Sequence, residues 1–184
     1  KAARDFPLAL GFVLSPDQSE APSGVPILMR GSPTFGPLWS VAGAVGPHTM
    51  LMDAANGLGT LSLPGDADGT VRRVPLLVLV GDTLRPGIAA EAVRLARQAS
   101  TYLIQSNPLR LGAATSTYSA ADVLAGDIDA QELTGSIILV GSSAPELGGL
   151  RTTAMDPLTP SVQIHSHAVR QMLDGRVPRS LAPK

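Results

Sequence analysis

The sequence contains no cysteine. Disulfide scaffolds and thiolate metal sites are therefore excluded. Aromatic residues are scarce, and the single tryptophan, Trp39, is expected to be a packing anchor rather than a platform for a ligand. Neither sign of charge dominates, because 14 basic and 15 acidic side chains give a net charge of −1. The composition thus offers no electrostatic basis for binding nucleic acid or an anionic membrane surface.

The sequence also lacks a long uninterrupted apolar run, although its mean hydropathy is +0.20. Its longest uncharged stretch, residues 31–52, is interrupted by Pro33, Pro37 and Pro47, which a helix spanning a bilayer would hardly tolerate. A chain of 184 residues is long enough for one domain with a real core. We expect a single domain over residues 1–184, and the abrupt ends suggest that it is a piece of a longer protein.

Strand and helix patterns alternate along the chain. Residues 8–15 and 136–140 are apolar runs bounded by proline, serine or glycine, and each predicts a buried strand. Residues 86–99 and 161–174 have the apolar periodicity of helices, and in the first of them Glu91, Arg94 and Gln98 align on a stripe apart from the apolar one. Residues 59–80 predict a β-hairpin that turns at Pro64–Gly69. We therefore expect an α/β fold with a mixed, mostly parallel sheet, helices on both faces and one β-hairpin.

The expected hairpin carries charges that invite two binding hypotheses. Asp66, Asp68 and Gly69 resemble part of a calcium loop, but in that register its first and last ligand positions would be prolines. Arg72 and Arg73 are adjacent in the second strand, so alternation should point them to opposite faces and prevent one anion clamp. The stretch is expected to be structural.

Two histidines resemble a metal pair. On a helix, residues two apart point about 200° apart, so His165 and His167 cannot share one ion there. His165 aligns with apolar residues and should be buried and hydrogen-bonded, whereas His167 falls on a polar face. If the segment were a strand, both would share a face and a zinc site would become feasible again.

The stretch after the expected strand 136–140 is the first place to look for a ligand. Ligands of open α/β sheets bind beyond the carboxyl ends of strands, and a loop of about twenty residues follows here. The candidate ligand-binding residues are Ser142, Ser143, Arg151 and His165. An ordinary strand-to-loop turn is the alternative. No metal or cofactor site is predicted, and no catalytic residue, because Ser142, His165 and Asp156 would form a triad only by coincidence of folding.

Four motifs in order resemble the CHASE2 family. They are PGDADGTVRRVPLLV, IAAEAVRLARQA, LTGSIILVGSSAPEL and PLTPSVQIHSHAVRQMLDGR, at residues 64–78, 88–99, 133–147 and 157–176. The chain departs from the family pattern at Ser161, where a glycine is usual, and at Arg151, where an acid is common. The family also has an upstream strand-helix unit, so the N-terminal part of the domain is expected to be missing.

The resemblance implies a function. CHASE2 domains are extracytoplasmic input modules of bacterial transmembrane receptors, coupled to adenylate cyclases, histidine kinases or serine/threonine kinases. We accordingly expect a non-enzymatic, periplasmic or cell-surface sensor of an unknown small molecule. It would be a homodimer, anchored to the membrane by helices outside this sequence, and would not bind nucleic acid. The alternatives are a stand-alone α/β enzyme or solute-binding protein using residues 141–165, and a structural spacer that pairs subunits.

Overall fold

The computed structural model describes residues 6–17, 19, 22–25, 27–29, 38–104, 109–110, 116–147 and 149–175. The helices are α1 (Thr49–Met52), α2 (Ile88–Ala96), α3 (Ala120–Ala125), α4 (Ala130–Leu133) and α5 (Ser161–Leu173). The strands are β1 (Ala9–Ser15), β2 (Ile27–Met29), β3 (Ser40–Val41), β4 (Gly43–Val45), β5 (Gly57–Thr60), β6 (Arg73–Val74), β7 (Leu77–Val80), β8 (Thr83–Pro86), β9 (Tyr102–Ile104), β10 (Leu109–Arg110), β11 (Leu150–Arg151) and β12 (Thr159–Pro160).

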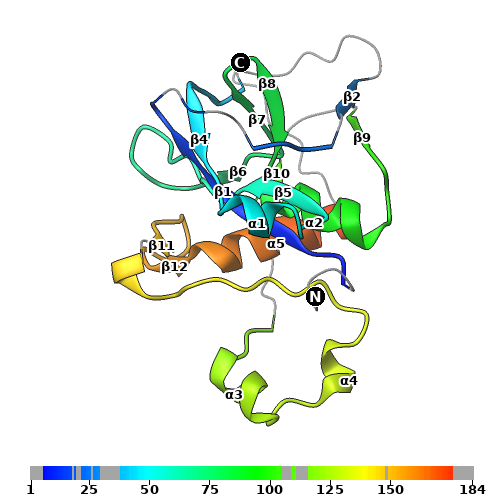
Figure 1. Cartoon of the computed structure of the whole chain (residues 1–184). Helices are drawn as coiled ribbons and strands as arrows, with labels where there is room; N and C mark the ends of the chain where they lie inside the picture. The colour runs from blue at the N-terminus through cyan, green and yellow to red at the C-terminus, as the bar shows by residue number, and fades with distance from the viewer. Residues whose placement is uncertain are drawn as a thin grey trace.

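The strands form several small mixed sheets (Figure 1). In one, β1 lies between β5, to which it is parallel, and β4, to which it is antiparallel. In another, β7 lies between β3, to which it is parallel, and β8, to which it is antiparallel. The pairs β10–β6 and β11–β12 are antiparallel, and β2–β9 is parallel. The mixed α/β class is confirmed, whereas one mostly parallel sheet with helices on both faces is not.

The predicted hairpin over residues 59–80 is wrong. β5 pairs with β1, and β7 pairs with β3 and β8. The turn after β5 instead closes on itself, because the Asp66 N–H donates to the Thr70 carbonyl at 3.0 Å. The actual hairpin joins β7 to β8 across Gly81, whose φ of 55° suits a two-residue turn. The observed two-residue turn closes a shorter loop than the predicted turn at Pro64–Gly69, so closing it costs less chain entropy.

The expected buried strand 136–140 is also wrong. The segment is extended, but it belongs to none of the described sheets. Ile137 and Leu139 pack against the core, while Ile138 and Val140 are 59% and 89% exposed. An apolar run indicates a tendency to form a strand, but whether it joins a sheet depends on a partner elsewhere in the chain.

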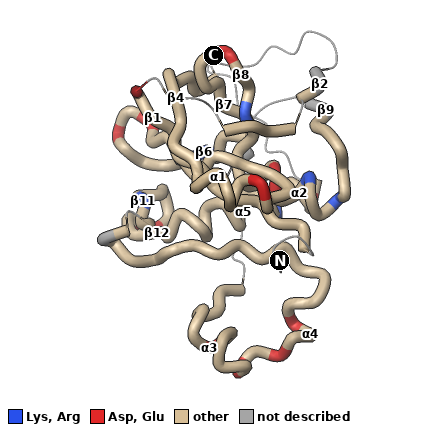
Figure 2. The backbone as a smooth tube through the Cα atoms, in the orientation of Figure 1, with Lys and Arg blue, Asp and Glu red and all other residues tan. Residues whose placement is uncertain are grey.

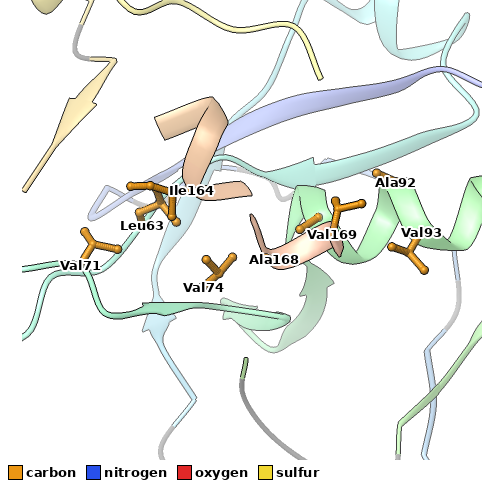
Figure 3. Packing of buried hydrophobic residues seen from close by; sticks show 9 residues of the cluster. Leu63, Val71, Val74, Ala92, Val93, Ile164, Ala168 and Val169 are labelled. Carbon is orange, nitrogen blue, oxygen red and sulfur yellow. The ribbon is translucent and has the colours of Figure 1, made fainter. Parts of the chain in front are cut away.

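The two long helices are confirmed and form one side of the core. α2 and α5 lie against each other, and both pack on the irregular stretch between β5 and β6. Figure 3 shows Ile164 near Leu63, and Val169 near Ala92. Burying the Ile164 side chain completely contributes about 1.5–3 kcal/mol to stability. The buried members of this cluster are Leu63, Val71, Val74, Ala89, Ala92, Val93, Ile164, Ala168 and Val169.

A second apolar cluster lies among the sheets. Phe12 of β1 is 1% exposed and packs with Leu58 of β5 and Val78 of β7. Trp39 is partly buried against the same cluster, which confirms its expected role as a packing anchor. Within the described parts of the chain, no helix has both the length and the apolar character needed to cross a membrane.

Candidate functional site

The loop after residue 140 is more structured than its composition indicates. Residues 145–147 form a turn of 3-10 helix, and β11 and β12 pair antiparallel. Between these strands, the Thr153 hydroxyl accepts from the Asp156 N–H at 3.1 Å and lies 3.0 Å from the Thr159 hydroxyl. The Val71 N–H donates to the Thr152 carbonyl at 2.8 Å. The loop is thus folded on itself and tied to the core.

Ser142 and Ser143 lie where the extended segment turns into this loop. The Ser142 hydroxyl accepts from the Ala144 N–H at 3.1 Å and so stabilises the turn locally. Its carbonyl oxygen lies so close to Gly149 that a Cβ there would collide with it. Ser143 is exposed. The geometry accounts for Ser142 as a turn residue, and ligand binding by either serine stays a prediction.

Arg151 lies in β11, on the far side of this turn. Its Nη1 donates to the Leu150 carbonyl at 2.9 Å, and the residue is half-buried. β11 is connected to the helix that follows, because the Ser161 N–H donates to the Gly149 carbonyl at 2.6 Å. Arg151 and the two serines therefore lie on one folded loop at the N-terminus of α5.

His165 is buried in α5, and its environment confirms the prediction of a buried, hydrogen-bonded histidine. The side chain is 3% exposed, and Nε2 lies 3.2 Å from the Leu61 carbonyl oxygen. Nδ1 is also buried and has no hydrogen-bond partner among the residues that the structure describes. Burial lowers the pKa of the imidazole, although the bond to Leu61 partly opposes this. Neither ring nitrogen is hydrogen-bonded to Ser142, Ser143 or Arg151, and ligand binding by His165 stays a prediction.

His167 differs from His165 as the helical periodicity predicts. It is half-buried, and its pKa is lowered by desolvation and by the nearby Arg170. Because α5 is helical over both residues, the two histidines point in different directions and cannot bind one metal ion together. Among the residues that the structure describes, no three histidine, aspartate or glutamate side chains are grouped to hold a metal ion.

The acidic turn at residues 66–69 is neutralised by arginines. Arg72 holds Asp68 through two hydrogen bonds of 2.9 and 2.8 Å, and this pairing lowers the pKa of the Asp68 carboxyl. Asp66 accepts from Arg72 at 3.0 Å and from Arg73 at 2.6 Å. The expectation that strand alternation separates the two arginines is wrong. Only Arg73 lies in β6, and both long side chains reach the same carboxylate.

Sequence reasoning missed a buried ion pair on α2. The alignment of Glu91 and Arg94 with Gln98 indicated a polar face, yet Glu91 is 1% and Arg94 8% exposed. Arg94 donates to Glu91 through Nε at 2.9 Å and Nη2 at 2.7 Å. The Glu91 carboxylate raises the pKa of the guanidinium. The i,i+3 spacing of opposite charges was the one signal available in the sequence.

The same guanidinium joins α2 to its surroundings. It donates to the Ala99 carbonyl at 2.7 Å and to the Asn56 carbonyl at 3.0 Å, and its carbon lies 5.9 Å from the centre of the Tyr102 ring. β5 approaches Glu91 so closely at Gly57 that a Cβ there would overlap the carboxylate. Four of the five guanidinium N–H groups are thus bonded within the protein, which makes the ion pair structural.

Comparisons with known proteins give one match. The family model described as CHASE2 domain matches residues 12–183, which is nearly the whole chain. Searches of curated proteins and of solved structures found no match.

Proposed function

The chain belongs to the CHASE2 domain family, and from this premise we propose that it is the input module of a membrane-anchored bacterial signalling receptor. CHASE2 domains are extracellular sensory domains of signalling receptors. The family match over residues 12–183 is the observation that carries the proposal. The output domain would be an adenylate cyclase, a histidine kinase or a serine/threonine kinase, as in the receptors that the motifs resemble.

The proposed domain senses rather than catalyses. Its most deeply buried charges, Glu91 and Arg94, are paired with each other. Its buried histidine bonds a backbone carbonyl and contacts no hydroxyl nucleophile through either ring nitrogen. A general base must lie within hydrogen-bond reach of the group it activates, and no hydroxyl among the described residues is hydrogen-bonded to His165. These contacts support a binding or signalling module.

We place the small-molecule ligand at the folded loop that carries Ser142, Ser143 and Arg151. Ser143 is exposed, and the half-buried Arg151 carries a planar guanidinium, the group that suits carboxylates and phosphates. The loop is fixed to α5 through Gly149 and Ser161. A ligand held there would act directly on the N-terminus of α5, the helix that contributes Ile164, Ala168 and Val169 to the main core.

Signalling by a membrane receptor requires an anchor in the membrane and a change between subunits. A ligand shifts a receptor only through a difference in its affinity for two states, and a dimer provides two arrangements of one domain pair. We therefore propose a homodimer held at the membrane.

The absence of cysteine allows a direct test of the location. Met155 is 94% exposed at the tip between β11 and β12, so Met155→Cys provides a reactive thiol without disturbing the core. In intact cells that express the full-length receptor, a membrane-impermeant maleimide should label this variant above the background of the unsubstituted protein. Labelling that needs permeabilised cells would place the domain inside and overturn the proposal.

A further inference from the structure

The extended segment Ser136–Val140 has the side-chain pattern of a strand in a sheet. Ile137 and Leu139 pack against the α2–α5 core, and the alternate residues Ile138 and Val140 are 59% and 89% exposed. At Gly141 a Cβ would lie 2.7 Å from the Val162 Cβ, so the segment passes close to α5. Figure 1 shows it running below α5 between α4 and β11. One face of the segment is therefore packed and the other is free.

Within the described part of the chain, the backbone of this segment has no strand partner either. No backbone hydrogen bond joins residues 137–141 to another residue in the described ranges. Extended apolar backbone without ladder bonds is a template for pairing with another strand, and natural proteins protect such edges with charges or proline. Here no charged side chain and no proline occurs from Thr134 to Ala144. The usual protection against edge pairing is missing.

We propose that a second copy of this chain pairs with Ser136–Val140, antiparallel and across a two-fold axis at Ile138. The proposal deepens the dimer of the proposed receptor and rests on it. In this register Ser136 lies opposite Val140, and Ile137 opposite Leu139. Residues directly opposite in an antiparallel pair point to the same face, so the core-facing residues of the two copies continue one apolar surface.

The distribution of charge favours a second copy as the partner and an antiparallel direction of pairing. The pairing segment carries no charge, so it meets its own copy without repulsion. The residues just before it, 116–135, contain four acids and no base, at Asp122, Asp127, Asp129 and Glu132, and Figure 2 shows acidic positions at α4 and in its connection to α3. A parallel pair would bring the two acidic stretches together. The antiparallel pair separates the Ser136 ends by about 14 Å, more than a Debye length at physiological salt.

The interface is expected to be weak in the free domain. A pair of five-residue strands buries less area than the roughly 1,200–2,000 Å² of a stable complex. Two copies tethered in one membrane reach effective concentrations in the range of about 1 mM, at which weak pairing suffices. Such a contact can form and separate with the signalling state, which a permanent interface cannot do.

Single-cysteine cross-linking tests the register. Across the proposed axis, the two copies of Ile138 have Cβ atoms about 5 Å apart, near the distance a disulfide spans, whereas the two copies of Val140 lie about 14 Å apart. Random collision would favour the more exposed Val140. Ile138→Cys should therefore form a disulfide dimer faster than Val140→Cys, and the double variant Ser136→Cys with Val140→Cys should regain efficient cross-linking.

Disulfide dimer formation is measured on the purified domain at about 0.1 mM, oxidised with copper-phenanthroline. Leu124→Cys on α3 is the control, because Leu124 is as exposed as Val140. The proposal would be overturned if Val140→Cys formed the dimer faster than Ile138→Cys, as exposure alone predicts, or if Ile138→Cys formed none.

Sedimentation checks the interface without disulfides. Ile138→Lys should abolish the concentration-dependent dimer, because like charges would face each other on the axis, and Leu124→Lys should keep it. Because the interface is weak, the wild type is followed up to about 1 mM, the effective concentration of the tethered copies, and a wild type that is still monomeric there would count against the interface. Maleimide labelling at residue 155 is independent, so the two proposals fail separately.

Discussion

Two ion pairs in this chain have nearly the same length, but one is buried and the other is exposed to solvent. Glu91 and Arg94 bond at 2.7 Å with side chains 1% and 7% exposed. Asp68 and Arg72 bond at 2.8 Å with side chains 55% and 43% exposed. Water can replace the partner of an exposed charge, whereas a buried charge that loses its partner stays unsolvated. The distance is therefore a poor guide to what each pair contributes.

The buried pair gives the largest expected effect. Arg94→Met leaves the Glu91 carboxylate without a partner, and its loss should lower the free energy of unfolding by about 3–5 kcal/mol. The measurement is urea unfolding of the purified domain, with the slope m checked for constancy.

A matched double variant separates charge from packing. Glu91→Leu combined with Arg94→Met replaces both charges by apolar groups of similar size, and should recover much of the stability lost by Arg94→Met alone. If the double variant were no more stable than the single one, the buried charge would not be the cause. The lost bonds to Asn56 and Ala99 would then carry the effect.

His165 extends the comparison to a buried group with an incomplete set of partners. Its folded-state pKa is lowered by burial, so the unfolded chain binds the proton more readily. The stability that this contributes is complete at neutral pH and is lost as the pH falls below the unfolded value of about 6.5 toward the folded value. Urea unfolding between pH 8 and 5 should show this loss. His165→Gln should reduce this pH-dependent loss of stability, and His167→Gln, which changes a half-buried ring, should reduce it less. Parallel pH profiles for wild type and His165→Gln would contradict this assignment.

Local periodicity predicted much of the helical structure. The apolar spacing around Ile88 and around Ile164 repeats every turn, and it correctly gave α2 and α5 and the burial of His165. These features were accessible because the residues that define a helical face are close in sequence. The same reasoning placed Glu91 and Arg94 on a polar face, since nothing within α2 shows that β5 passes over them.

The errors about Glu91, the hairpin and the segment 136–140 concern partners distant in sequence. The burial of Glu91 depends on Gly57, whose missing side chain lets β5 approach the carboxylate. The pairing of β5 with β1, rather than with the strand after the turn, involves residues from the start of the chain. The segment 136–140 has strand-like residues but no strand partner in the described structure, which no property of the segment itself reveals.

The exposed ion pairs of Asp66 and Asp68 with the neighbouring arginines give the smallest expected effect and the sharpest contrast with the buried pair. Asp68→Asn removes the charge that pairs with Arg72, while the amide oxygen can still accept from the Thr70 N–H, so it should lower Tm slightly at low salt. In about 1 M NaCl the Debye length falls to about 3 Å, and the difference from wild type should vanish. Asp66→Asn should cost more than Asp68→Asn at low salt, because two arginines bond to the Asp66 carboxylate. Thermal unfolding of both variants at two salt concentrations checks this. A loss for Asp68→Asn as large as that for Arg94→Met, or one that high salt leaves unchanged, would show that exposure does not distinguish the two groups of charges.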